Sequence, residues 1–352
     1  MKRFKKIGIL FLSLLSLCLF MSCELIYEQT PGRIILIGVG LDYMNSDGSS
    51  ETFLDDNEGL PNPPNDIREL AYVFSHFASE SNKEFIYIPM IQQYMINSIP
   101  PSNYPNKSNL EALFLDLLNN DDIDAKVYDG DFDEDDYTLE SEYSTFGSEV
   151  SSIDPISEND ILIFYYSGHG NESDDGALRL PKDADEQDRE SIELSWFYNY
   201  FSLFDCKVLV VLDSCGSGSF IMDSNSTVNT ITTSFVDTLP SLYDKYFTYK
   251  NDNIVINDIY AMASTRPDEL SFDTRTLGVN HPNSIFSYYF LRALGYENNS
   301  DVKIGSINDK ISALENGKIT IDNIYEYIYD NISRQEPLIK GDRKSLVLFT
   351  IN

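Results

Sequence analysis

The stretch DILIFYYSGHG, residues 160–170, determines which fold class this chain can adopt. Its apolar run, from Ile161 to Tyr166, lacks the polar alternation of a half-exposed strand. A short run of this kind is typical of a strand buried on both faces of a parallel sheet. The run ends in a tip that carries His169 between two glycines. The stretch therefore predicts a buried parallel strand with a histidine at its carboxyl end.

Similar apolar runs recur along the chain and alternate with segments of helical spacing. Strands are expected at residues 33–40, 84–91, 207–212, 254–263 and 345–351, with a short extra strand at 125–132. Helices are expected at residues 66–77, where Asn65 would be the N-cap, and at 109–118, 190–204, 284–294 and 320–332. This alternation predicts an α/β fold in which a mainly parallel sheet lies between helical layers.

A second strand ends in a chemically distinctive tip. The apolar run 207–213 is followed by Ser214-Cys-Gly-Ser-Gly218. If this strand and the one at 160–167 are parallel neighbours, His169 and Cys215 emerge at the same edge of the sheet. A thiol becomes a nucleophile when a nearby imidazole takes its proton. The backbone N–H groups of Gly170 and Cys215 are the expected donors of an oxyanion hole.

The thiol of Cys215 is expected to be free. Only Cys206 and Cys215 lie beyond residue 23. The strand between them, extended at ~3.3 Å per residue, holds them roughly 20 Å apart, whereas a disulfide needs Cα atoms within ~7 Å. Cys206 is therefore expected to pack as a small hydrophobic residue. The histidines and cysteines have no zinc-binding spacing, so no structural metal is expected.

The first 22 residues are expected to be a targeting signal. Four cations precede an apolar run from Ile7 to Met21, which is short for a membrane span of ~20 residues. The following Ser22-Cys23 resembles the end of a bacterial lipoprotein signal, in which Cys23 would become the lipidated first residue. This predicts export to the cell envelope, with membrane contact only through the N-terminal lipid. Ordinary secretion and an uncleaved anchor remain alternatives.

The composition limits the class of partner. Lys and Arg number 25 against 57 Asp and Glu, so the formal net charge is −32. That excess argues against binding nucleic acid, which needs clustered cations, and permits attraction of basic ligands. An acidic, Ser-rich stretch near 133–157 is expected to be a surface insertion. The long polar connection 220–253 is a candidate functional segment, in which Lys245 and Lys250 are the only basic residues.

The two strand-end motifs, Ser-Gly-His-Gly and Asp-Ser-Cys-x-Ser-Gly, together resemble the metacaspase-like branch of the caspase family. Other stretches resemble the same family: Asn65–Ile67, Leu180–Asp183, Ala261–Ser271, Ser284–Ser287 and Ser333–Gly341. The resemblance covers most of residues 32–352, which would form one peptidase domain. It implies a three-layer α/β/α sandwich around a six-stranded sheet, with His169 and Cys215 as the catalytic dyad of an endopeptidase.

The resemblance also implies which peptide bond is cut. Metacaspases accept Arg or Lys as the residue before the scissile bond (P1) through acidic groups in the S1 pocket. Asp213 stands two residues before Cys215, so strand alternation points both to the same side, and Ser167 has the same relation to His169. Asp66 resembles the family's other pocket acid. The predicted S1 pocket is therefore Asp66, Ser167 and Asp213, and its substrates are proteins or peptides with a basic P1 residue. The resemblance also implies self-cleavage in the connection 220–253, because caspase relatives are often cut there during activation, and Lys245 and Lys250 would be the cleavage points.

Three departures or open points accompany the resemblance. Metacaspases usually carry His after the catalytic Cys, where this chain has Gly216. Some metacaspases need calcium, and Asp183, Asp185 and Asp188 would be its ligands here, although a merely acidic loop is the favoured explanation of these residues. No other cofactor is expected. A non-catalytic peptide-binding protein of the same fold, or a legumain- or clostripain-type peptidase of other specificity, are the alternative functions.

Overall fold

The computed structural model describes most of the chain beyond its first 31 residues. The described residues are 32–44, 59–93, 99–119, 125–130, 132, 146–170, 177–181, 190–221, 259–277, 283–298, 304–341 and 346–351. Several sequence predictions fall outside these ranges: the signal segment and Cys23, residues 133–145 of the insertion, Asp183, Asp185 and Asp188, and Lys245 and Lys250. In the described part of the chain, no helix is long and apolar enough to cross a membrane.

A six-stranded sheet forms the centre of the molecule, in the order β14-β9-β8-β5-β1-β2. The strands are β1 (Ile34–Leu41), β2 (Phe85–Gln92), β5 (Ile161–Ser167), β8 (Lys207–Asp213), β9 (Ile259–Ala263) and β14 (Leu338–Lys340). All neighbouring pairs are parallel except β14 with β9. The predicted mainly parallel six-stranded sheet is confirmed.

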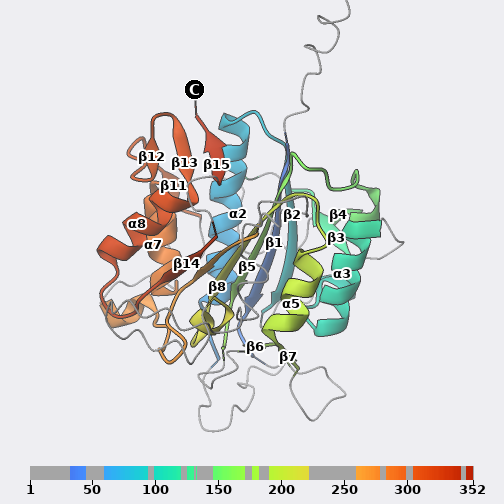
Figure 1. The fold of residues 1–352 in the computed structure, drawn as a ribbon, viewed down its shortest axis with the longest axis horizontal. Coiled ribbons are helices and arrows are strands. Elements are labelled where there is room, and N and C mark those ends of the chain that lie inside the picture. The colour runs from blue at the N-terminus through green and yellow to red at the C-terminus, as the bar shows by residue number, and fades with distance from the viewer. Residues whose placement is uncertain are drawn as a thin grey trace, which may run out of the picture.

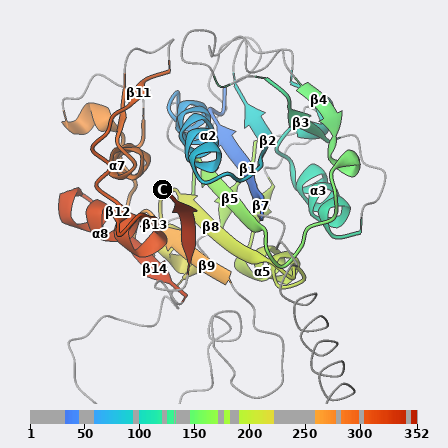
Figure 2. The same cartoon turned by 90° about the horizontal axis from the view of Figure 1, so that it is seen from above.

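Helices cover both faces of this sheet (Figures 1 and 2). One layer holds α2 (Pro63–Glu80), α7 (Ile285–Ala293) and α8 (Ile321–Asn331), and the other holds α3 (Lys107–Asn119) and α5 (Leu194–Phe201). Alternate residues of each strand enter the two cores: on β5, Ile163 and Tyr165 pack in the first, Leu162 and Phe164 in the second. The architecture is the three-layer α/β/α sandwich expected from the sequence.

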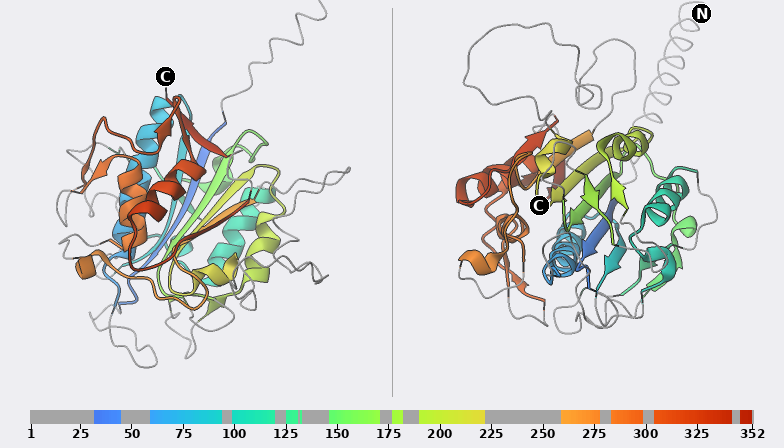
Figure 3. Two further views of the ribbon diagram at one scale, coloured as in Figure 1. Left: turned by 60° about the vertical axis from the view of Figure 1, so that its left-hand side comes forward. Right: turned by 90° about the horizontal axis from the view of Figure 1, so that it is seen from below.

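Two strands differ from expectation. The strand expected at 345–351 forms as β15 (Val347–Thr350), but it pairs with β13 (Lys318–Thr320) in a separate sheet with β12 (Leu314–Glu315), near α7 and α8 (Figure 3). The sixth strand of the central sheet is instead β14, which the sequence analysis missed. β14 is a three-residue, half-buried edge strand, so it carries no continuous apolar run.

Two helices also begin elsewhere than expected. α2 starts at Pro63 and not after Asn65, because two prolines occupy its first turn and their fixed φ suits that position. The N-cap is Asn62, whose side chain makes no capping hydrogen bond. In the region 190–204, only Leu194–Phe201 is helical; it follows the short strand β7 (Ser191–Ile192), which pairs with β6 (Leu178–Arg179).

The remaining short elements lie at the periphery. β3 (Lys126–Tyr128) confirms the short extra strand and pairs with β4 (Phe146–Glu149), which lies in the region expected to be an insertion. β10 (Tyr296–Glu297) pairs with β11 (Ser306–Ile307). Single 3-10 turns occupy Pro101–Asn103, Val150–Ser152, Ser217–Phe220 and Thr274–Leu277. The last two follow β8 and β9, and they belong to the site described next.

Candidate active site

The ends of β5 and β8 bring the predicted histidine and cysteine together. The two strands are parallel neighbours, and their last paired residues are Ser167 and Asp213. Gly168 N–H donates to Asp213 O at 3.2 Å, which extends the pairing beyond both strands. His169 and Cys215 both line a cavity of about 170 Å³ at this edge. The prediction that they emerge at the same edge of the sheet is confirmed.

Two buried tyrosines hold the histidine loop. The His169 N–H donates to Tyr43 Oη at 2.8 Å, and the two rings lie 4.6 Å apart between centroids. Tyr166 Oη donates to His169 O at 2.7 Å, and the two tyrosine hydroxyls are 2.9 Å apart. Burial first, and then the neighbouring Tyr43, raise the pKa of Tyr166, so its hydroxyl remains a donor. The sequence analysis missed Tyr43, whose φ of 54° lies in the left-handed region.

The cysteine lies on a tight turn that is anchored to the segment after β9. Gly216 has a φ of 63°, a conformation that glycine adopts without strain. Gly216 N–H donates to Glu269 O at 2.9 Å. Thr265 Oγ1 donates to Ser214 O at 3.1 Å. Backbone and hydroxyl bonds therefore fix the residues on both sides of Cys215.

Gly170 allows the two strand tips to approach closely. A Cβ atom at this position would lie 2.0 Å from the carbonyl oxygen of Cys215 and 2.8 Å from Ser214 Oγ. Any other residue at 170 would push the histidine tip away from the cysteine turn. The two predicted oxyanion donors, Gly170 and Cys215, thus belong to directly contacting backbone segments.

The carboxylate of Asp213 is buried beside the cavity and is surrounded by serines. It is 2% exposed, yet it lines the cavity. Oδ2 accepts from the hydroxyls of Ser284 and Ser287, the latter at 2.7 Å, and Oδ1 accepts from Ser271 Oγ at 3.1 Å. Burial raises the pKa of Asp213, while these hydroxyl donors oppose the rise. The serines of the α7 N-terminus were not foreseen as its partners, because they lie far along the chain.

Asp66 sits behind the cavity wall. It is 1% exposed and accepts from Ser167 Oγ at 2.8 Å and from Asn283 Nδ2 at 2.9 Å. Ser284 N–H also donates to it, at 3.2 Å, so one residue contacts both buried carboxylates. Burial and the nearby charge of Asp213 raise the pKa of Asp66 well above its usual value. The three predicted S1 residues therefore lie together, although only Ser167 and Asp213 line the cavity.

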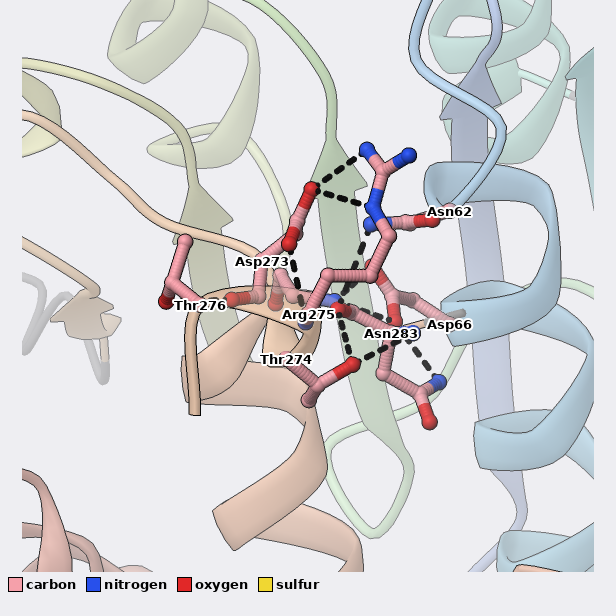
Figure 4. A network of polar contacts seen from close by, with 8 residues as sticks. Asn62, Asp66, Asp273, Thr274, Arg275, Thr276 and Asn283 are labelled. Carbon is pink, nitrogen blue, oxygen red and sulfur yellow. Dashed lines mark hydrogen bonds and ion pairs between the residues drawn. The ribbon is translucent and has the colours of Figure 1, made fainter. Parts of the chain in front are cut away.

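A third carboxylate, at the cavity rim, was missed by the sequence analysis. Asp273 lines the cavity and forms an ion pair with Arg275, whose Nε and Nη2 lie 2.9 and 2.5 Å from Oδ2 (Figure 4). Figure 4 also shows a buried polar network in which Asn283 joins Asp66 to Thr274. The pocket thus offers carboxylates in two places, and one of them already holds a guanidinium.

The second thiol differs from the first. Cys206 is buried among apolar residues of the core that α3 and α5 cover, and burial raises its pKa to about 12. The prediction that it packs as a small hydrophobic residue is confirmed. Cys215 is partly exposed, and neither of these two cysteines forms a disulfide. In the described ranges, no group of three His, Cys, Asp or Glu side chains has the arrangement of a metal site.

The chain matches the model of a known protein family. The family model described as the caspase domain matches residues 50–318, which is more than half of the chain and includes both strand tips and the acidic residues of the pocket. No curated protein matches the chain.

Proposed function

The chain belongs to the caspase-domain peptidase family, and we propose that it is a cysteine endopeptidase in which Cys215 and His169 form the catalytic dyad. The family supports a cysteine-type peptidase in general. The observation that carries the specific proposal is the pairing of β5 with β8, which places the imidazole and the thiol on one cavity.

The geometry supports a two-step acyl transfer. His169 takes the proton of the Cys215 thiol as the sulfur attacks the scissile carbonyl carbon, and the carbonyl oxygen takes the negative charge, toward which the N–H groups of Gly170 and Cys215 would donate. The C–N bond then breaks as protonated His169 gives its proton to the leaving amine. Water then attacks the resulting thioester while His169 accepts a proton from it. The C–S bond breaks, the carboxylic acid leaves, and His169 returns the proton to the Cys215 sulfur.

The surroundings of the pocket support a basic P1 residue. Asp213 lines the cavity and Asp66 stands behind Ser167, so an entering guanidinium or ammonium would meet negative charge in a partly dry site. Charge-assisted hydrogen bonds of this kind are strong and geometrically selective. The Arg275–Asp273 pair at the rim is an internal instance of the same contact. An acidic P1 side chain would be repelled.

A panel of otherwise identical peptides with Arg, Lys or Asp at P1 tests both parts of the proposal. Cleavage after Arg or Lys should exceed cleavage after Asp by orders of magnitude, and Asp213→Asn should remove most of that difference. Cys215→Ala should abolish turnover, whereas the matched Cys206→Ala should retain it. Efficient cleavage after Asp by the parent enzyme would refute the specificity. Turnover by Cys215→Ala would refute the dyad, and a parent chain that binds peptides without cleaving any would indicate a non-catalytic binding protein.

A further inference from the structure

We propose that the backbone N–H of Ser271 is a catalytic hydrogen-bond donor to the Cys215 thiolate, and that Gln335 is the residue that positions it. The inference rests on the proposed cysteine peptidase function and adds two groups to its machinery. Ser271 N lies 3.3 Å from Cys215 Sγ, with its N–H directed at the sulfur.

The acidic pocket gives this donor a chemical task. A negative charge near a thiol disfavours the thiolate and raises the pKa of the thiol. The titratable groups that line the cavity with Cys215 are His169 beyond β5, Asp213 at the end of β8, and Asp273 in the loop after β9; Asp66 of α2 stands behind Ser167. The carboxylates that would bind a basic substrate therefore raise the pKa of the Cys215 thiol and lower the fraction of thiolate. An N–H donor at the sulfur stabilises the thiolate and offsets this effect.

The loop that carries this N–H is closed by one buried amide. Gln335 lies in the connection between α8 and β14 and is 5% exposed. Its Nε2 donates to Ser264 O at 3.0 Å, and its Oε1 accepts from Phe272 N–H at 3.1 Å. Ser264 directly follows β9, and Phe272 directly follows Ser271. The side chain therefore joins the start of the loop to the peptide next to the donor.

Other contacts of the same connection are more exposed. Glu336 N–H donates to Glu269 Oε2 at 2.9 Å, and the Glu336 carboxylate pairs with Arg266 at 3.2 Å, on side chains that are roughly a third to a half exposed. Exposed ion pairs add little stability. The buried Gln335 amide is therefore the part of this connection that fixes the direction of the Ser271 N–H.

The pH dependence of Cys215 alkylation by iodoacetamide, located by peptide mass mapping, tests the proposal without a peptide substrate. Ser271→Pro removes the N–H directly, and Gln335→Ala removes its positioning. Both should move the alkylation profile to higher pH, by about one unit, because the thiolate loses a donor. Gln335→Glu keeps the acceptor for Phe272 N–H and should restore part of the shift.

Asn103 provides a matched control. It is a fully buried amide that donates to Pro89 O and Lys126 O, both at 2.9 Å, beside the opposite edge strand β2. Asn103→Ala should lower the melting temperature as Gln335→Ala does, yet leave the alkylation profile in place. If Ser271→Pro does not fold, the alkylation profile of Gln335→Ala alone tests the proposal. Equal profiles in the parent and in folded Gln335→Ala would overturn the inference, whereas absence of turnover in the parent would refute only the proposed peptidase.

Discussion

Two aspartates of the candidate site, Asp66 and Asp213, are buried carboxylates whose negative charges repel each other. Asp66 and Asp213 are both almost inaccessible, and the serine and asparagine donors around them compensate only part of the cost. Buried charges of this kind lower stability in exchange for a preorganised site. The acidic pocket should therefore lower the free energy of unfolding while it provides negative charge for binding a basic substrate.

This cost predicts a pH dependence of stability. The pKa of Asp66 is raised on folding, so its stabilising contribution is present below the ordinary carboxyl value of 3.8 and is lost as pH rises through the folded pKa. Asp66→Asn should raise the melting temperature at pH values above that window, with a difference that shrinks toward low pH. Thermal unfolding measured across pH checks this.

Asp160 gives a control of opposite sign. Burial alone would raise its pKa, but hydrogen bonds from Arg33 and Ser157 outweigh burial and lower it. Its contribution is present above the unfolded pKa and is lost as pH falls through the folded pKa. Asp160→Asn should therefore destabilise the protein at neutral pH. If Asp66→Asn and Asp160→Asn shifted the melting temperature in the same direction at neutral pH, the opposite pKa shifts assigned to Asp66 and Asp160 would be contradicted.

At the residue scale, the sequence was informative wherever a strand tip carried the signal. Period-two alternation predicts that Ser167 faces the same side as His169 and that Asp213 faces the same side as Cys215, and all four residues line one cavity. Tyr43 and Ser271 were not predictable, because their contacts join segments that are distant in sequence. No local sequence pattern indicates that the Ser271 N–H donates to a sulfur. Nor does one indicate that the Tyr43 hydroxyl supports the histidine loop.

At the scale of elements, α7 contributes more than packing. Ser284 is its N-cap and accepts from Ser287 N–H at 3.0 Å, while Ser287 N–H also donates to Asp213 Oδ2 at 3.2 Å. The first turn of a helix carries partial positive charge, which favours an adjacent carboxylate. One helix N-terminus thus stabilises the ionised form of the pocket acid.

Ser284→Ala should remove the cap and one donor to Asp213 together. The cap loss should cost about 1 kcal/mol of stability. The lost donor should raise the pKa of Asp213, so the pH profile of kcat/KM for cleavage after Arg should move to higher pH. Thr320→Ala is the control, because Thr320 caps α8 in the same way, accepting from Asn323 N–H at 3.2 Å. An identical profile shift in both variants would argue against the link to Asp213.

The elements themselves were predictable to different degrees. Long apolar runs identified the five parallel strands, because burial on both faces leaves an unmistakable pattern. The sixth position was not predictable: β14 is short and half-buried, and β15 has the stronger apolar pattern but packs in a smaller sheet. An apolar sequence pattern indicates that a segment is buried, but it does not indicate which strand or helix the segment packs against.

At the scale of the whole molecule, the net charge of −32 should act on substrate approach. A strongly negative surface attracts a cationic peptide, and salt screens that attraction. Raising the ionic strength should lower kcat/KM for a peptide with several basic residues more than for a net-neutral peptide with the same Arg at P1. Stopped-flow or steady-state assays at several salt concentrations check this, and equal salt dependence for the two peptides would exclude steering.

The hydrogen-bonded register of β5 and β8 has a consequence for how such a chain can change over generations. One residue inserted within either strand would displace its tip by ~3.3 Å and turn the next side chain to the opposite face, separating the imidazole from the thiol. Insertions in the segments that join the two strands leave the register untouched. The reactive pair can therefore be inherited intact while the surrounding chain lengthens, shortens and diverges.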